Sequence, residues 1–176
     1  MMNMALIKQL NNISLSRWYW LVFIFGSISL MSIALYYQYA REELPCTMCI
    51  QVRLWFTSLI IMSLIGLLLR KNRVVNTLAQ LSVVVIAGGL VERSYQLLGT
   101  ERGFVFASCG VDLGLPAWFA IENWLPWVYR VETSCGYTPE VLFGITMAEA
   151  LMGLNVLLLI GSVCVLLASI ITMLRR

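Results

Sequence analysis

The cysteines are the residues best suited to chemistry in this sequence. The chain has five Cys and no His, which disfavours the many hydrolytic triads and metal sites that depend on imidazole. Cys46 and Cys49 form a C-x-x-C pair, a spacing typical of cysteines that cycle between thiol and disulfide. Cys109 and Cys135 lie farther along the chain, and Cys164 stands alone in an apolar stretch. We expect Cys164 to pack as a small hydrophobic residue and assign it no role.

The first four cysteines can pair in three ways. Pairing of Cys46 with Cys49 and of Cys109 with Cys135 keeps each disulfide within one loop. The other pairings join the two loops and are candidates for transient states. Purely structural disulfides are the simplest alternative for both pairs. A disulfide across two intervening residues removes little chain entropy, so redox activity is favoured for the first pair.

The residues around the C-x-x-C pair favour a thiolate. Pro45 immediately precedes Cys46, and Pro is common where a helix begins. The pair then lies in a first helical turn, where the partial positive charge of the helix end stabilises a thiolate. Arg53 follows Cys49 by four residues and therefore shares its face. A snorkelling interfacial Arg is the alternative, but charges within membrane spans are usually functional, and the functional interpretation is favoured.

The elements that must position these cysteines are membrane helices. Hydrophobic residues make up 60% of the 176 residues and charged residues only 12%, against roughly 45–50% and about 25% in soluble domains. Apolar runs cover about residues 18–37, 50–69, 74–91 and 151–174, each near the roughly 20 residues of a spanning helix. Loops remain at about 38–49 and 92–150. The sequence predicts one domain, residues 1–176, an all-α membrane protein with a four-transmembrane-helix bundle.

Charge predicts the orientation of this bundle. Both termini and the loop between the second and third runs are basic, whereas the two remaining loops are rich in Asp and Glu. Under the positive-inside rule both termini lie in the cytoplasm and the cysteine loops face the outer side, where disulfides persist in bacteria. The basic residues that carry this prediction have no acidic neighbours within their segments: Lys8, Arg17, Arg70, Lys71, Arg73, Arg175 and Arg176.

Two segments of the long loop carry further predictions. Between Pro116 and Leu125, Trp118 and Ile121 share a helical face with Leu125, with Trp124 beside them. This pattern predicts a short helix in the membrane interface of the second periplasmic loop. Residues 100–110 have no helical period, and they could lie extended in a partner's groove and present Cys109 or form an ordinary loop.

These motifs together resemble a known family, bacterial disulfide bond formation protein B (DsbB), over essentially the whole chain. The resemblance rests on the four-helix order and on the following residues: Pro45-Cys46-Thr47-Met48-Cys49-Ile50 with Arg53 downstream, Cys109 and Cys135 in the long loop, Leu115-Pro116-Ala117-Trp118 and Asn123-Trp124-Leu125-Pro126. It implies a thiol–quinone oxidoreductase of the bacterial inner membrane that reoxidises a periplasmic DsbA-like dithiol oxidase. The implied partners are that oxidase, the membrane quinone pool and the lipid bilayer, with no nucleic acid and no metal.

The resemblance also implies residue roles. Cys109, paired with Cys135, would be attacked by the partner's thiolate, and electrons would pass between the loops through a Cys46–Cys135 bridge. Cys49 would become the thiolate that faces the quinone, ubiquinone or menaquinone, with Arg53 stabilising the charge.

One feature departs from the family pattern. Members often place a His near the outer end of the third helix, whereas this chain has none. Glu92, Arg93 and Tyr95 occupy that region and are the candidates for assisting proton uptake.

Other functional classes remain as alternatives. Four thiolates could bind a zinc ion, although Cys109 and Cys135 are far apart for such a site. The chain could also be a structural membrane subunit with inert disulfides. Within the enzyme class, a thiol oxidase of the vitamin K epoxide reductase type shares the chemistry, but its cysteine arrangement fits less well.

Overall fold

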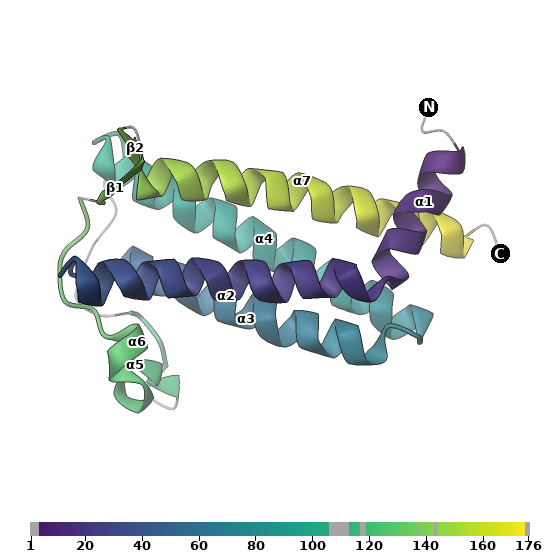
Figure 1. Cartoon of the computed structure of the whole chain (residues 1–176), viewed down its shortest axis with the longest axis horizontal. Helices are drawn as coiled ribbons and strands as arrows, with labels where there is room; N and C mark the ends of the chain where they lie inside the picture. The colour runs from purple at the N-terminus through teal and green to yellow at the C-terminus, as the bar shows by residue number, and fades with distance from the viewer. Residues whose placement is uncertain (1–3, 106–112, 117–118, 137, 143, 175–176) are drawn as a thin grey trace.

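The protein, as a computed structural model, is an elongated bundle of membrane-length helices (Figure 1). The structure describes residues 4–105, 113–116, 119–136, 138–142 and 144–174. Four helices in this part of the chain are long and apolar enough to cross a membrane: α2 (Arg17–Ala40), α3 (Thr47–Leu69), α4 (Arg73–Glu101) and α7 (Met147–Leu174). This arrangement confirms the predicted all-α four-helix membrane bundle.

The shorter elements lie at the two ends of the bundle. A helix that the sequence did not suggest, α1 (Met4–Leu15), lies at the end where the chain also begins and ends (Figure 1). At the opposite end lie α5 (Ile121–Trp124), α6 (Pro126–Tyr129) and the antiparallel strands β1 (Glu140–Leu142) and β2 (Ile145–Thr146). We call these the inner and the outer end. Both chain termini therefore share one end, as an even number of spans requires.

The long helices continue beyond the apolar runs that predicted them. The largest extension is in α4, which passes Glu92 and Arg93 and ends only at Glu101. Charged side chains limit how far a segment enters lipid, but they do not interrupt backbone hydrogen bonding. The helix stops where Gly103 adopts φ 74°, a left-handed conformation typical of the residue after a helix C-cap.

Close packing of α2, α3 and α4 forms the core of the bundle. Trp20 is fully buried in a cluster with Leu59 and Val83, and its ring lies where a side chain on Gly66 would otherwise be. Between α4 and α7, the buried Asn155 amide donates a hydrogen bond of 2.8 Å to the Ser94 hydroxyl. Such interhelical polar contacts are a common source of specificity in membranes.

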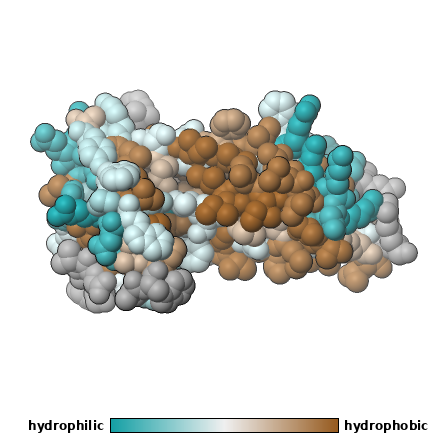
Figure 2. All heavy atoms as spheres, turned by 90° about the horizontal axis from the view of Figure 1, so that it is seen from below, coloured by the Kyte–Doolittle hydropathy of each residue, from teal (hydrophilic) through white to brown (hydrophobic). Residues whose placement is uncertain are grey.

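The outward faces of the helices are apolar. Figure 2 shows hydrophobic residues across the middle of one face of the bundle and hydrophilic residues toward its two ends. Large exposed side chains on these faces include Val22, Leu68, Val85 and Leu157. In water such a surface would drive aggregation, so the surface fits a lipid surrounding.

The predicted interfacial helix is divided. Instead of one helix ending at Leu125, the chain forms α5 and then α6, which begins at Pro126. Proline cannot continue the hydrogen bonding of the preceding helix, but it is well suited to begin a new one. Trp124 and Trp127 are both exposed, as expected for side chains at a membrane boundary. The predicted contribution of Trp118 lies outside the described residues.

Candidate functional site

The C-x-x-C pair forms the beginning of α3. Cys46 is the N-cap residue, with an extended backbone, and its Sγ accepts a hydrogen bond of 3.3 Å from the backbone N–H of Cys49. The two Sγ atoms lie 2.8 Å apart. The capping hydrogen bond closes the first turn of the helix, so the side chains of Cys46 and Cys49, three residues apart, lie on the same side. The pair is therefore placed for forming and breaking a disulfide.

The second loop carries Cys135 to this pair. The backbone N–H groups of Glu132 and Thr133 donate to the carbonyl oxygen of Pro45 at 3.0 and 3.4 Å. Cys135 packs against Cys46, and the two side chains are joined by a hydrogen bond. Cys46 thus lies between two other sulfurs, one from its own helix and one from the other loop.

These contacts set the ionisation of Cys46. The hydrogen bond from Cys135 lowers its pKa, but the hydrogen bond with Cys49 and burial raise it, and the pKa of Cys46 reaches about 12. Its side chain is only 1% exposed. At neutral pH Cys46 is therefore a thiol in its reduced state, and it can donate a hydrogen bond to a neighbouring sulfur.

Arg53 lies one helical turn below Cys49 and is buried, with 5% exposure. Its guanidinium donates to the side-chain oxygen of Gln38 at 2.6 Å and to the backbone oxygens of Val128 and Ala34 at 2.8 and 3.3 Å. All three acceptors are neutral. These three groups hold the positive charge in place but do not cancel it, and a buried charge is costly unless an anion compensates it.

Cys49 and Arg53 line the same cavity, of about 450 Å³. Its walls come mainly from the outer parts of α2, α3 and α7 and are largely apolar. The volume is within the range of roughly 300–1,000 Å³ that is typical of small-molecule sites. Ile33 and Leu154, on two different helices, line the cavity and are both exposed. The cavity therefore combines a thiol, a cation and apolar walls at the bundle surface.

Comparison with known families and curated proteins finds relatives of this chain. Residues 16–167 match the family described as disulfide bond formation protein DsbB. Disulfide bond formation protein B 2 of Pseudomonas aeruginosa is 30% identical over 146 residues, which cover 82% of this chain and 84% of that protein. Disulfide bond formation protein B of Shewanella sp. strain MR-4 is 33% identical, covering 76% and 77% of the two chains.

The chain belongs to the DsbB family. The predicted resemblance is thereby confirmed, and with it a multi-pass membrane protein with an oxidoreductase role in disulfide bond formation.

The other residues named from the sequence of this DsbB family member have different outcomes in the structure. Cys109 lies outside the described residues. Cys164 is exposed on α7 instead of packed in the bundle, because its helix position faces the lipid. Glu92 and Arg93 form a chain of side-chain hydrogen bonds with Gln96 along α4. Neither they nor Tyr95 lines the cavity, so the structure does not bring these proton-uptake candidates to Cys49.

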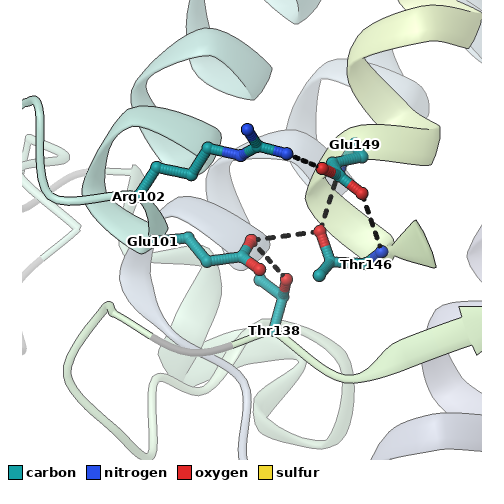
Figure 3. A network of polar contacts seen from close by, with 5 residues as sticks. All are labelled: Glu101, Arg102, Thr138, Thr146 and Glu149. Atoms are coloured by element: carbon teal, nitrogen blue, oxygen red, sulfur yellow. Dashed lines mark hydrogen bonds and ion pairs between the residues drawn. The ribbon is translucent and has the colours of Figure 1, made fainter. Parts of the chain in front are cut away.

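Sequence reasoning overlooked several residues of the site. Gln38 is the polar residue that binds Arg53, and its position at the end of the first apolar run was the available signal. Glu42 and Glu43 line the cavity from the first outer loop. A further polar network joins the end of α4 to the beginning of α7 (Figure 3). Its sequence signal was a Thr-x-x-Glu capping pattern at Thr146 and Glu149.

Proposed function

We propose that this protein is a protein dithiol:quinone oxidoreductase that reoxidises a DsbA-like periplasmic oxidase. The observation that carries the proposal is the shared cavity of Cys49 and Arg53, combined with the position of Cys46 between Cys49 and Cys135. This arrangement supports a path for two electrons from the long loop, through neighbouring sulfurs, to an acceptor in the cavity.

The chemistry of the cavity fits a quinone. Its apolar walls suit the ring and the attached chain, and its lipid-facing edge offers a route from the membrane pool. Either ubiquinone or menaquinone has the required character, since both are lipid-soluble rings with carbonyl oxygens. A bound quinone would supply the two-electron oxidant and take up two protons on becoming a hydroquinone. Cys49 and Arg53 are the residues that would hold its polar end.

The cysteines would transfer electrons by disulfide exchange. The partner's thiolate attacks Cys109 of a Cys109–Cys135 disulfide, which gives a mixed disulfide and releases Cys135 as a thiolate. Cys135 then attacks Cys46, so that a Cys46–Cys135 bond forms, the Cys46–Cys49 bond breaks and Cys49 leaves as a thiolate. Each exchange conserves electrons and needs a thiolate, an accessible sulfur and a leaving thiol.

The remaining exchanges complete the cycle. The partner's second thiol resolves the mixed disulfide, which leaves the partner oxidised and Cys109 reduced. Cys109 then attacks Cys135, restoring the loop disulfide and leaving Cys46 and Cys49 reduced. Cys46 and Cys49 are then the residues that would give two electrons to a quinone held in the cavity, and their disulfide would re-form.

Arg53 would stabilise negative charge in the cavity. Its hydrogen bonds to Gln38, Val128 and Ala34 fix the guanidinium in the cavity that it shares with Cys49, and none of these three partners is acidic. A fixed cation in a site that excludes water stabilises developing charge without reorganisation. It therefore favours Cys49 as the thiolate and lowers the barrier to electron transfer.

The proposed location is the bacterial inner membrane, with both termini in the cytoplasm and the outer end in the periplasm. The basic residues at the inner end support this orientation. It places the cysteines in the compartment where disulfides are made.

Single-turnover quinone reduction tests the proposal. The purified protein, with a short-chain ubiquinone added, is mixed with a reduced DsbA-type protein, and quinone absorbance is followed. We expect the unmodified chain to reduce about one equivalent of quinone per dithiol and Cys49→Ser to reduce none. Cys164→Ser is the matched control and should retain full activity, because Cys164 lies on the lipid face of α7. Undiminished quinone reduction by Cys49→Ser would exclude the proposed chemistry.

A further inference from the structure

We propose that Glu101 is a positioning residue that closes the base of the long loop and thereby holds Cys135 against Cys46. This inference rests on the proposed function, because it assigns a purpose to the exchange between the two loops. It concerns a polar network at the outer end, which we call the latch: Glu101, Arg102, Thr138, Thr146 and Glu149 (Figure 3).

Glu101 is the centre of the latch. Its Oε2 atom accepts a hydrogen bond from the Thr138 hydroxyl at 2.7 Å and another from the Thr146 hydroxyl at 3.3 Å. Figure 3 shows both hydroxyls directed at this one carboxylate. Glu101 is the last residue of α4, whereas Thr138 follows the cysteine segment of the loop. The carboxylate thus joins the two ends of the long loop.

A second set of contacts within the latch involves the beginning of α7. Thr146 and Glu149 form a capping box: the Thr146 N–H donates to the Glu149 carboxylate at 3.2 Å, and the Glu149 N–H donates to the Thr146 hydroxyl at 3.3 Å. Arg102 forms an ion pair with the same Glu149 carboxylate. The ends of α4 and α7 are therefore held together, and Thr138 is attached to a fixed base.

Cys135 is anchored on both sides. On its N-terminal side, Thr133 is hydrogen-bonded to Pro45, next to Cys46. On its C-terminal side, Thr138 is hydrogen-bonded to Glu101. Only two residues separate Cys135 from Thr138, and each residue spans at most about 3.4 Å. With both anchors in place, the sulfur of Cys135 has a short range of positions, and these include contact with Cys46.

The latch is suited to this task because its bonds are strong and partly protected. Thr138 is buried, with 3% exposure, and hydrogen bonds to a carboxylate are stronger than those between neutral groups. Tethering raises the effective concentration of one thiol at another only when the linkage restricts their separation. Without the Glu101 anchor, the C-terminal side of this segment would lose a fixed point, and the position of Cys135 would be less restricted.

The step served by the latch is the attack of Cys135 on Cys46. In that step the Cys46–Cys135 bond forms, the Cys46–Cys49 bond breaks, and the electron pair remains on Cys49. The latch contributes no electrons and no protons. It changes only how often the two sulfurs meet.

How often the two sulfurs meet is measured by the effective concentration of Cys135 at Cys46. This quantity does not depend on quinone chemistry. A full-length chain with Cys49, Cys109 and Cys164 replaced by Ala is equilibrated with glutathione buffers, and the Cys46–Cys135 disulfide is quantified by thiol trapping. We expect Glu101→Ala to lower the effective concentration roughly tenfold, equivalent to about 1.4 kcal/mol. Glu92→Ala, at an acidic residue of the same helix, should leave it unchanged.

Two comparisons separate positioning from general damage. In a chain that keeps only Cys46 and Cys49, the disulfide forms within one helical turn, so Glu101→Ala should leave its effective concentration unchanged. If Glu101→Ala lowered the effective concentration equally for both disulfides, or lowered it for neither, the inference would be overturned. If Glu101→Ala does not fold, Thr138→Val and Thr138→Ser provide the test: Val should reproduce the tenfold loss and Ser, which retains the hydroxyl, should restore the original value.

The test of the latch and the test of the proposed function can fail independently of each other. A chain that never reduces quinone, yet shows the selective loss for Cys46–Cys135, would contradict the proposed function and leave the latch standing. A chain that reduces quinone normally with Glu101→Ala and shows no selective loss would contradict the latch alone.

Discussion

The two ends of the same helix pair, α2 and α3, are packed in opposite ways. At the inner end, Trp20 is fully buried against α3, and its ring atoms lie within 2.5–2.6 Å of where a Cβ on Gly66 would be. At the outer end, the same two helices line the cavity that contains Cys49 and Arg53. There Arg53 of α3 donates hydrogen bonds to Gln38 and Ala34 of α2.

This difference suggests a way in which one bundle can combine stability with the proposed quinone site. A cavity loses the dispersion contacts that its walls would otherwise make, and in lipid those contacts are a main source of helix association. The inner end and the polar contact between α4 and α7 supply that association. The outer end can then remain open around reactive side chains. Changes at the outer end should alter activity more than stability, and changes at the inner end should do the reverse.

Replacement of Arg53 should have the largest effect. We expect Arg53→Ala to slow quinone reduction about a hundredfold, as is common when one charge-stabilising donor is removed from a site. Arg53→Lys should recover part of the rate, because Lys restores the charge but not the planar fork that binds Gln38 and the backbone. Stopped-flow measurement of quinone reduction checks this, with the exposed Arg130→Ala as control. Unchanged quinone kinetics in Arg53→Ala would contradict the role given to this residue.

Replacement of Gly66 tests the inner end. A methyl group on Gly66 would overlap the Trp20 ring, and such overpacking typically destabilises by about 1–3 kcal/mol. We therefore expect Gly66→Ala to lower the free energy of unfolding by this amount while the folded fraction keeps its quinone reduction rate. Reversible unfolding in mixed micelles provides the measurement. Gly26→Ala, also in this helix pair, meets open space and should be neutral.

The smallest expected effect concerns ionisation at the outer end. The pKa of Cys46 is lowered by its hydrogen bond with Cys135, and it is raised by the hydrogen bond with Cys49 and by burial, to about 12. Cys135→Ala should therefore raise the pKa of Cys46, and Cys49→Ala should lower it and extend the thiolate form toward neutral pH. NMR titration of the Cys46 Cβ carbon in the reduced protein gives both values. Shifts of the same sign in the two variants would show that the three sulfurs are not coupled as described.

The sequence determined the parts of this protein that depend on neighbouring residues. The apolar runs indicated four spanning helices because the length and polarity of a segment decide whether it can cross lipid. Pro45 and the C-x-x-C spacing predicted both cysteines at the beginning of α3, where Cys46 is the N-cap residue and Cys49 lies in the first turn. The spacing to Arg53 placed the cation on the same face as Cys49. These relations span at most two helical turns, so they follow from helix geometry alone.

Only the tertiary structure decided which distant residues meet. The partners of Arg53, the cavity between α2, α3 and α7, and the contact of Cys135 with Cys46 all join segments that are separated by long stretches of sequence. The continuation of α4 to Glu101 and the latch that it begins were also absent from the sequence prediction. Hydropathy marks the boundary of the lipid, whereas hydrogen bonds outside it depend on which loops the packed helices bring together.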